Sequence, residues 1–267
     1  MDFQTHYITP DVKLSRYEGR LFKTEATFDY HMLIWFISGE TRIIQADATY
    51  VFRSGDVFLI PRNQPTTVIT APTGDTPHQA VAMHLTTTRL RDFYRDKPFS
   101  TPVVAVPKVR QFAAHPLLES CLTSLLPYFQ LEGIFPEEIA ALKITEALTV
   151  LRRIDPGVDG ILGNFEEPGK IDLVDFMEKN FAFNLPLSTF SYLTGRSLAT
   201  FNRDFRKAFR TTPQRWLTQK RLELAHYQLA EKHRKPVDVY LEAGFENLSH
   251  FSFAFRRQYG YPPGSVV

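Results

Sequence analysis

The sequence predicts an α+β protein in which a β-rich N-terminal domain precedes an all-helical C-terminal domain. In residues 1–110, short segments rich in Val, Ile, Phe and Thr are separated by Gly, Pro, Asp and Asn, a pattern typical of strands joined by turns. In residues 170–263 the apolar residues recur three and four positions apart, which is the period of amphipathic helices. A content of 43% hydrophobic and 22% charged residues over 267 positions indicates a globular chain long enough for two domains.

The N-terminal strands are expected to be short and numerous, which suggests a sandwich or a barrel. Gly39-Glu40 and Gly55-Asp56 are expected to form hairpin turns between them. The segments expected as strands are residues 31–38, 42–46, 49–52, 57–61, 66–71 and 79–85.

Two apolar helices are expected after the strands, at residues 115–130 and 136–153, and together they predict an antiparallel pair. Their wide apolar stripe needs a partner, which is either the barrel of the same chain or a second copy. Residues 155–170 are rich in Gly, Pro and acidic residues, and this composition indicates a linker. The expected organisation is therefore a domain at 1–155, a linker at 156–169 and a helical domain at 170–267.

A helix-turn-helix pattern is found around Gly244. The apolar run 237–243 ends at this glycine, as expected where a short helix stops and turns. Asn247 is a good N-cap for a second helix, which carries Phe251 and Phe255 on one face. Two short helices joined by such a turn are typical of units that place their second helix on DNA.

The same pattern occurs about fifty residues earlier. A short apolar helix meets Gly195, and Ser197 is a good N-cap for the helix that follows. One face of this helix is expected to carry Phe201, Phe205 and Phe209, and the other face Arg203, Arg206 and Lys207. The sequence therefore predicts two helix-turn-helix units.

The segment between the two patterns is expected to be one long helix. It opens with Thr212-Pro213, a cap followed by proline at the first helical position, and continues to about residue 232. Such a helix spans roughly 30 Å, and recognition helices about 34 Å apart enter successive major grooves of B-DNA. Residues 197–267 hold 12 Lys and Arg against 6 Asp and Glu, although the whole chain has a net charge of only +2. This arrangement predicts double-stranded DNA as the partner.

Residues 170–263 resemble the DNA-binding domain of the AraC/XylS family of bacterial transcription regulators. The resemblance rests on Arg221-Leu222, Ala225, Ala243-Gly244-Phe245, Ser249, Phe251, Phe255-Arg256-Arg257, Gly260 and Pro262. It implies a sequence-specific regulator, in most members an activator that contacts RNA polymerase.

Four positions depart from the pattern of this family. Ser191 and Tyr240 stand where alanine is usual in the first helix of each unit. Arg210 replaces the glycine that normally ends the first recognition helix, and an arginine disfavours a left-handed cap. Phe253 replaces an arginine in the second recognition helix, where it either touches a thymine methyl group or packs.

The expected DNA contacts follow from the two recognition helices. Asn202 is suited to adenine and Arg203 to guanine, so the first unit is expected to carry most of the base readout. The residues expected at base edges are Ala199, Asn202, Arg203, Ser249, His250 and Ser252. Those expected at phosphates are Arg206, Lys207, Arg256 and Arg257.

The segment 39–69 is similar to the cupin-type jelly roll found at the N-terminus of many AraC regulators, through Gly39, Tyr50, Gly55-Asp56 and Pro61. Cupin enzymes usually bind a metal through two histidines and a glutamate on an early strand and a later histidine. Only His31 lies on that strand here, so we expect no metal, no cofactor and no enzymatic activity. The candidate residues for a ligand pocket are His31, Trp35, Tyr50, Phe58, Met83 and His84.

Three uses of the N-terminal barrel remain open from the sequence. It binds a small-molecule effector or mediates a homodimer, it docks a protein antagonist, or, least in keeping with the missing ligand set, it is a metal-dependent enzyme. The single cysteine, Cys121, excludes an intramolecular disulfide framework and fits a reducing compartment. With no signal-peptide pattern and no apolar run of membrane-spanning length, we expect a cytoplasmic protein without a membrane partner.

Overall fold

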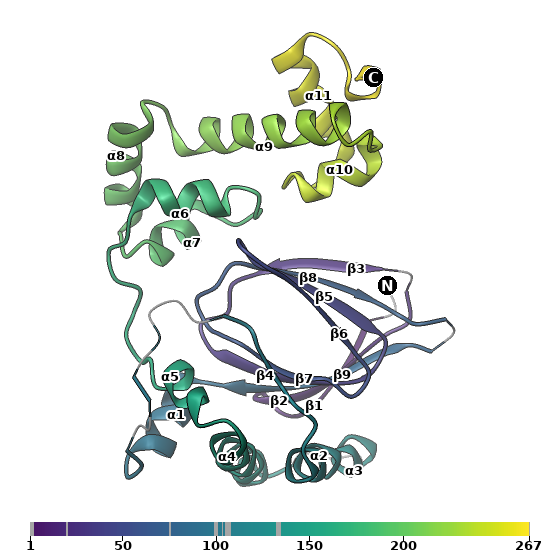
Figure 1. The fold of residues 1–267 in the computed structure, drawn as a ribbon, viewed down its shortest axis with the longest axis vertical. Helices are drawn as coiled ribbons and strands as arrows, with labels where there is room; N and C mark the ends of the chain where they lie inside the picture. The colour runs from purple at the N-terminus through teal and green to yellow at the C-terminus, as the bar shows by residue number, and fades with distance from the viewer. Residues whose placement is uncertain are drawn as a thin grey trace. The chain divides into compact units, whose positions relative to one another are not determined.

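The computed structural model describes residues 3–19, 21–74, 76–98, 101–102, 104, 108–131 and 135–266. These residues form two compact units, Met1–Glu166 and Glu167–Val267 (Figure 1). The first unit contains all of the strands in the described ranges, and the second contains only helices and turns. The predicted α+β class is therefore confirmed.

The N-terminal unit is built from two antiparallel sheets that face each other. The six-stranded sheet has the order β1-β2-β9-β4-β7-β10, and the four-stranded sheet has the order β3-β8-β5-β6. Phe52 of one sheet and Phe58 of the other stack with their ring centroids 3.8 Å apart. Aromatic side chains therefore fill the core between the two sheets. The strands are β1 (Phe3–Thr9), β2 (Val12–Tyr17), β3 (Phe22–Ala26), β4 (His31–Ser38), β5 (Glu40–Ile44), β6 (Thr49–Arg53), β7 (Val57–Ile60), β8 (Thr66–Ala71), β9 (His78–Leu85) and β10 (Arg110–Phe112).

Helices cover the outer face of the six-stranded sheet and form a second core with it (Figure 1). Leu33 and Met83 on the sheet pack with Leu122, Ala147 and Leu148 on the helices. These helical elements are α1 (Thr87–Tyr94), α2 (Pro116–Thr123), α3 (Leu126–Gln130), α4 (Glu137–Ile154), η1 (Pro156–Val158) and α5 (Asp159–Leu162).

Four details of this unit differ from the sequence-based expectation. The turns at Gly39-Glu40 and Gly55-Asp56 are not hairpins, because each joins a strand of one sheet to a strand of the other. The region expected to contain only strands includes α1, whose first turn is capped by the Thr86 hydroxyl accepting from the Arg89 amide. The expected helix 115–130 is divided into α2 and α3 at Ser124 and Leu125. Residues 156–162, expected in a linker, form η1 and α5 instead, because the apolar residues among them are buried in the same core.

The C-terminal unit is made of helices around the long helix α9 (Figure 1). The predicted long helix between the two repeats is confirmed, although it ends two residues earlier than expected. The helices are α6 (Leu173–Asn180), α7 (Leu187–Leu193), α8 (Leu198–Phe209), α9 (Pro213–Ala230), α10 (Pro236–Glu242) and α11 (Leu248–Tyr259), followed by the turn η2 (Pro263–Ser265). Across the described ranges, every helix is too short or too polar to span a lipid bilayer.

Candidate DNA-binding interface

The first helix-turn-helix unit is formed by α7 and α8. Gly195 in the turn has φ +63°, and a Cβ at this position would lie 2.3 Å from the carbonyl carbon of Gly169, so the turn requires glycine. The amides of Gly195 and Arg196 donate to the carbonyls of Tyr192 and Ser191, both at 2.9 Å, which ends α7. The Ser197 hydroxyl accepts from the Thr200 amide and begins α8, as the sequence predicts.

The second unit, α10 and α11, repeats this backbone arrangement. Gly244 has φ +87°, and the Phe245 amide donates to the Tyr240 carbonyl at 2.9 Å. The Asn247 side chain accepts from the His250 amide at 2.8 Å and caps α11. The turns differ in length, since Ser197 follows its glycine by two residues and Asn247 follows its glycine by three. The predicted duplication is thus confirmed, with a one-residue insertion in the second turn.

Each recognition helix is anchored by its own small core. In α8, Phe201 and Phe205 are fully buried against a cluster that includes Phe190, Trp216 and Leu217. In α11, Phe251 and Phe255 are fully buried in a separate cluster that includes Val239, Phe245, Leu222 and Leu229. The two halves of α9 therefore serve two different cores, with Trp216 and Leu217 in one and Leu222 and Leu229 in the other.

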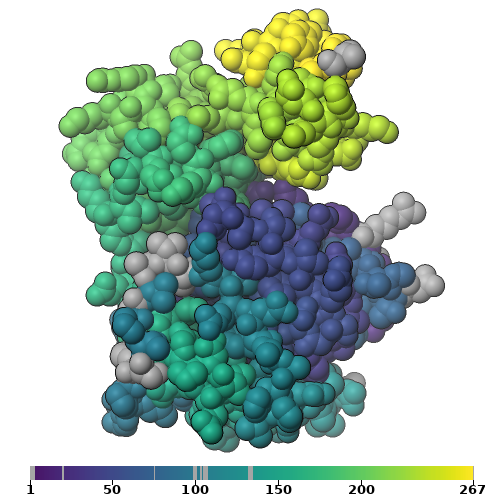
Figure 2. Space-filling view, in the orientation of Figure 1, coloured from purple at the N-terminus to yellow at the C-terminus, as the bar shows by residue number. Residues whose placement is uncertain are grey.

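The ten residues expected to contact DNA all lie outside these two cores. Asn202 and Ser252 are half-buried, and the other eight are exposed. In the space-filling view, the helix α11 forms part of the yellow surface of the C-terminal unit (Figure 2). The Asn202 amide donates to the Leu198 carbonyl at 2.9 Å, so it must turn away from its own helix before it can read adenine.

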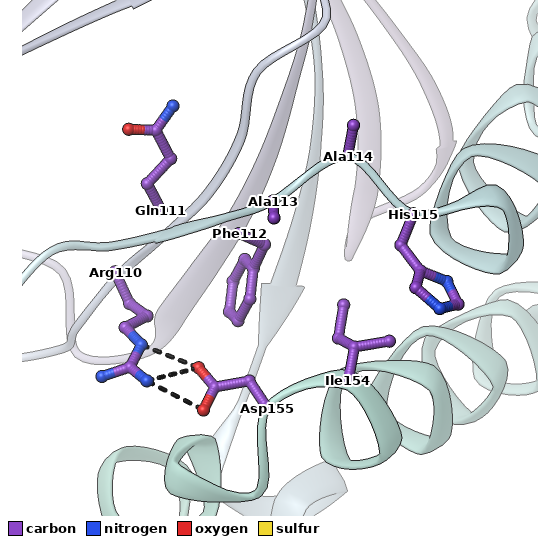
Figure 3. A pocket seen from close by; sticks show the side chains of 8 residues that line it. All are labelled: Arg110, Gln111, Phe112, Ala113, Ala114, His115, Ile154 and Asp155. Atoms are coloured by element: carbon purple, nitrogen blue, oxygen red, sulfur yellow. Dashed lines mark hydrogen bonds and ion pairs between the residues drawn. The ribbon is translucent and has the colours of Figure 1, made fainter.

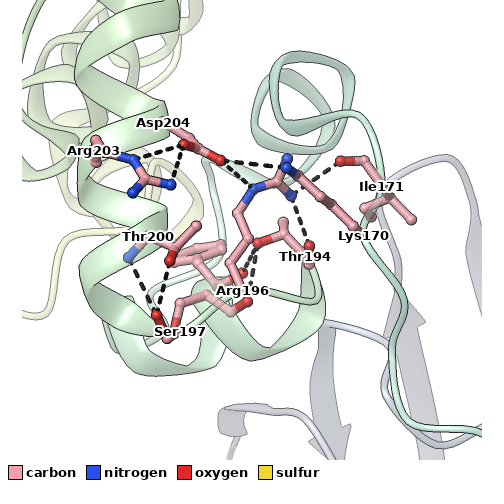
Figure 4. Close-up of polar contacts among 10 residues, drawn as sticks. Lys170, Ile171, Thr194, Arg196, Ser197, Thr200, Arg203 and Asp204 are labelled. Atoms are coloured by element: carbon pink, nitrogen blue, oxygen red, sulfur yellow. Dashed lines mark hydrogen bonds and ion pairs between the residues drawn. The ribbon is translucent and has the colours of Figure 1, made fainter.

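A polar network that the sequence did not reveal fixes α8 to its turn (Figure 4). Arg196 has a nearly buried side chain, and its Nε donates to Asp204 Oδ2 at 3.2 Å. Lys170 and Arg203 lie 3.9 and 3.4 Å from the same carboxylate. Burial acts to raise the pKa of Asp204, but the Arg196 hydrogen bond and the two neighbouring positive charges lower it overall. The carboxylate therefore stays ionised and holds the guanidinium of the exposed Arg203 side chain close to α8.

The two helix-turn-helix units are joined by a buried arginine on α9. Arg221 donates from Nε to the Phe181 carbonyl at 2.9 Å and from Nη2 to the Phe183 carbonyl at 2.8 Å. Its Nη1 donates to Asn184 Oδ1 at 3.3 Å. A Cβ on Gly244 would lie 2.8 Å from Arg221 Nε, so this guanidinium contacts the turn of the second unit as well as the loop after α6.

A second contact links the same loop to the second turn. Asn184 Nδ2 donates to Glu246 Oε1 at 3.0 Å, and the Ala182 carbonyl lies 2.5 Å from the position of a Cβ on Gly244. In the sequence, Arg221 is only one member of a family motif. Its role depends on residues 181–184 and 244–246, which the fold brings together.

The end of α8 contradicts the expectation for Arg210. This residue adopts the left-handed conformation with φ +57°, and its amide donates to the Arg206 carbonyl at 3.0 Å. Gly260 has the equivalent role at the end of α11, with φ +85°. The closing hydrogen bond and the chain direction into α9 therefore outweigh the steric cost of a side chain at this φ.

Replacing Arg210 with glycine is expected to stabilise the C-terminal unit by about 1 kcal/mol, because glycine removes the strain of the left-handed conformation. Urea unfolding monitored by Trp216 fluorescence, in a chain where Trp35 is phenylalanine, measures this change. The matched control is Gly260→Arg, where an added Cβ meets nothing within 4 Å, so any loss of stability reports φ alone. An unchanged or lowered midpoint for Arg210→Gly would contradict the prediction.

The six candidate residues for a ligand pocket are divided between two layers of the N-terminal unit. His31, Trp35 and Met83 lie on the face of the six-stranded sheet that packs against the helices, because they alternate with residues of the opposite face. His84 pairs with Met32, and Phe58 pairs with Ile34, on the face that points between the sheets. Tyr50 also packs in the core between the sheets. The six residues therefore cannot line one pocket, since alternate residues of a strand point to opposite faces.

The buried histidines of this unit are held neutral. The Arg62 amide donates to His31 Nδ1 at 3.3 Å, and burial, with the nearby charge of Arg62, lowers the pKa of His31 to about 3. Burial lowers the pKa of His78 to about 4, and burial together with Lys13 lowers the pKa of His84 to about 4. Within the described ranges, no group of three or more His, Cys, Asp or Glu side chains is arranged to hold a metal ion.

A cavity of about 200 Å³ lies between the strand β10 and the C-terminal end of α4, and not in the space between the two sheets (Figure 3). Arg110 Nε and Nη2 donate to the two carboxylate oxygens of Asp155 at 2.7 and 2.8 Å along one side of it. None of the six candidate pocket residues lines this cavity.

The fold and its exposed basic helices define a two-unit protein with a β-rich unit and a duplicated helix-turn-helix unit. A family model described as a helix-turn-helix domain matches residues 192–267, and one described as the ExsA N-terminal regulatory domain matches residues 31–156. With one match on each unit, the chain combines a helix-turn-helix domain of the kind found in AraC/XylS regulators with an N-terminal regulatory domain of the ExsA kind.

Curated relatives are similar over 160 residues. The HTH-type transcriptional regulator ExsA of Pseudomonas aeruginosa is 32% identical, with 59% of this chain and 57% of that protein covered. The virulence regulon transcriptional activator VirF of Yersinia enterocolitica is 29% identical, with 58% of each chain covered. The chain thus spans less than two thirds of the length of these relatives.

Matches among solved structures have low sequence identity. An apo form of ToxT from Vibrio cholerae has 10% identity and a TM-score of 0.47, covering 96% of each chain. The DNA-binding domain of AdpA, in complex with a target DNA, has 25% identity and a TM-score of 0.33, covering 34% of this chain and 82% of that one.

Proposed function

We propose that this protein is a sequence-specific regulator of transcription that binds double-stranded DNA and acts as an activator. The observation that carries the proposal is the pair of capped recognition helices, α8 and α11, each with a buried phenylalanine face and an exposed basic face. The helix α9 between them has 18 residues and spans about 27 Å, a length suited to helices that enter successive major grooves. Activation is supported by the similarity to VirF, a virulence regulon transcriptional activator.

The two kinds of contact are assigned by position along the recognition helices. Arg203 lies in the N-terminal half of α8, with its side chain exposed, and is suited to the bidentate contact with guanine. Arg206, Lys207, Arg256 and Arg257 lie in the last turns of α8 and α11, where contacts with phosphates are expected. In this proposal Arg203 determines which DNA sequence is preferred, and the four phosphate-contacting residues determine the affinity for DNA and its dependence on salt.

The variant Arg203→Ala is expected to lose about 1–3 kcal/mol of binding free energy on the preferred duplex and to tolerate every base at one position. The full chain first selects duplexes from a random-sequence pool, and fluorescence anisotropy then compares the selected duplex with its single-base variants. A loss that is equal for all duplexes would contradict base readout by Arg203.

The variant Arg257→Ala serves as the matched control for this experiment. It is expected to weaken binding to the selected duplex and to random DNA by the same factor, and to reduce the slope of log K against log salt by about one. If wild-type protein enriches no sequence in the selection, the proposed function itself fails.

We infer that the N-terminal unit forms a homodimer through α4. Leu142 on this helix is 70% exposed, and Thr145 and Thr149 continue the exposed stripe at helical spacing. Sedimentation equilibrium of the full chain is expected to show a dimer for wild type and a monomer for Leu142→Glu. The control is Leu21→Glu, an exposed leucine in the segment before β3. A dimer that persists in Leu142→Glu would exclude this interface.

The packing between the sheets argues against a small-molecule effector in that space, so we favour a protein partner that docks on the surface of this unit. Phe36, Phe52 and Phe58 are buried there with their rings against one another, so an effector would have to displace these rings. A thermal-shift screen of metabolites on the full chain distinguishes the two, because a specific ligand raises apparent stability. We also propose that the protein has no enzymatic activity and that it activates transcription in the cytoplasm by contacting RNA polymerase. In vitro transcription from the selected site tests the effect on RNA polymerase.

A further inference from the structure

The recognition helix α11 exposes a phenylalanine. Phe253 is 67% exposed, whereas Phe251 and Phe255 on the same helix are fully buried. It belongs to neither core of the C-terminal unit, and among the described residues it makes no ring contact. Of the two roles open from the sequence, packing within the C-terminal unit is therefore excluded.

The position of Phe253 is that of a base-contacting residue. It is the sixth residue of α11, and Arg203 is the sixth residue of α8. Both helices begin with a side-chain cap and bury a phenylalanine two residues before and two residues after this position. The repeat therefore places the Phe253 ring where the first unit places the guanidinium of Arg203.

The surroundings of this ring favour DNA over an apolar protein surface. On a helix, the neighbours of Phe253 are the residues three and four positions away. These are Ser249, His250, Arg256 and Arg257, and all four are exposed. A single ring framed by polar and basic side chains offers no continuous apolar patch, but it matches a methyl group in a groove lined by phosphates.

We propose that Phe253 determines specificity in the second unit by packing on the 5-methyl group of thymine in the major groove, which rests on the proposed binding of DNA. Among the base edges of the major groove, thymine presents this apolar group. The two units then read their sites by different chemistry, hydrogen bonding by Arg203 and apolar contact by Phe253. The site is accordingly asymmetric, with guanine in one groove and thymine in the next, about one helical turn away.

Substitution of thymine by deoxyuridine tests this proposal, because it removes only the methyl group. In the duplex selected by the full wild-type chain, each thymine is replaced in turn and the affinity is measured by anisotropy. At one or two positions the affinity of wild type is expected to fall about fourfold, the effect of exposing one buried methyl group. The same replacements are expected to have no effect on Phe253→Ala.

Two further variants make the result specific. Arg203→Ala, altered at the equivalent position of the first unit, should keep the fourfold deoxyuridine effect, and Phe253→Arg should exchange the thymine preference for guanine. Unfolding monitored by Trp216 fluorescence confirms that these exposed substitutions leave the fold intact. The proposal is overturned if no thymine methyl affects wild type, or if the effect persists in Phe253→Ala. Either result leaves sequence-specific DNA binding in place, whereas failure to select any duplex refutes the proposed function.

Discussion

Replacing Arg221 with alanine is expected to lower the free energy of unfolding of the C-terminal unit by roughly 3–5 kcal/mol. The variant leaves the Phe181 and Phe183 carbonyls and the Asn184 side chain without the donors that they have in the wild type. Urea unfolding in a chain where Trp35 is phenylalanine measures the change through Trp216, since the chain has only two tryptophans and Trp35 lies in the other unit. Arg215→Ala, on the exposed side of the same helix, is expected to change the stability by less than about 0.5 kcal/mol.

The conservative variant Arg221→Lys separates charge from geometry. Lysine keeps the charge but lacks the planar fork that reaches several acceptors at once, so we expect it to remain destabilised. Pulsed EPR between spin labels at Ala208 and Gln258, exposed equivalents on α8 and α11, should show a broader distance distribution in Arg221→Lys. Wild-type stability and an unchanged distribution would show that Arg221 does not fix the two units.

The second large effect is expected in the N-terminal unit, where Asp159→Asn should cost about 3–5 kcal/mol. Asp159 is 0% exposed and accepts from Arg152 Nε and Nη2 at 2.7 and 2.8 Å and from the Tyr94 hydroxyl at 2.6 Å. Burial and the bond to Asp159 raise the pKa of Tyr94. The amide would leave the Arg152 guanidinium without its counter-charge, and Trp35 fluorescence in a Trp216→Phe chain reports the loss.

An exposed ion pair of the same unit supplies the control. Lys108 lies 2.5 Å from Asp47 with both side chains more than half exposed, so Asp47→Ala is expected to change the unfolding midpoint little. Replacing both Asp159 and Arg152 by leucine should recover part of the lost stability, because no buried charge then remains unpaired. Equal effects of Asp159→Asn and Asp47→Ala would contradict a structural role for the buried pair.

Much of the helical unit could be predicted from the sequence because its signals are local. Ser197, Thr212 and Asn247 are recognisable as caps, and each accepts the expected hydrogen bond within three residues. The burial of Phe201, Phe205, Phe251 and Phe255 follows from their spacing of four on each helix. The exposed basic residues follow from the same period, which is why the candidate interface can be located without the structure.

The N-terminal unit was less predictable because its organisation depends on strand register. His31 and His84 lie on neighbouring strands of one sheet but point to opposite faces, and nothing in the sequence states which residues pair. The same holds for residues 156–162, whose Gly and Pro content indicates a linker but whose apolar members are buried in the core.

Local sequence was sufficient to place the starts of the recognition helices, their buried faces and the repetition of the helix-turn-helix pattern, since each depends on residues within one or two turns. It was not sufficient for the bridging role of Arg221, the left-handed conformation of Arg210 or the exposure of Phe253. These three properties depend on which distant segments meet in the folded chain, because long-range packing can override a local preference or act where no local preference exists.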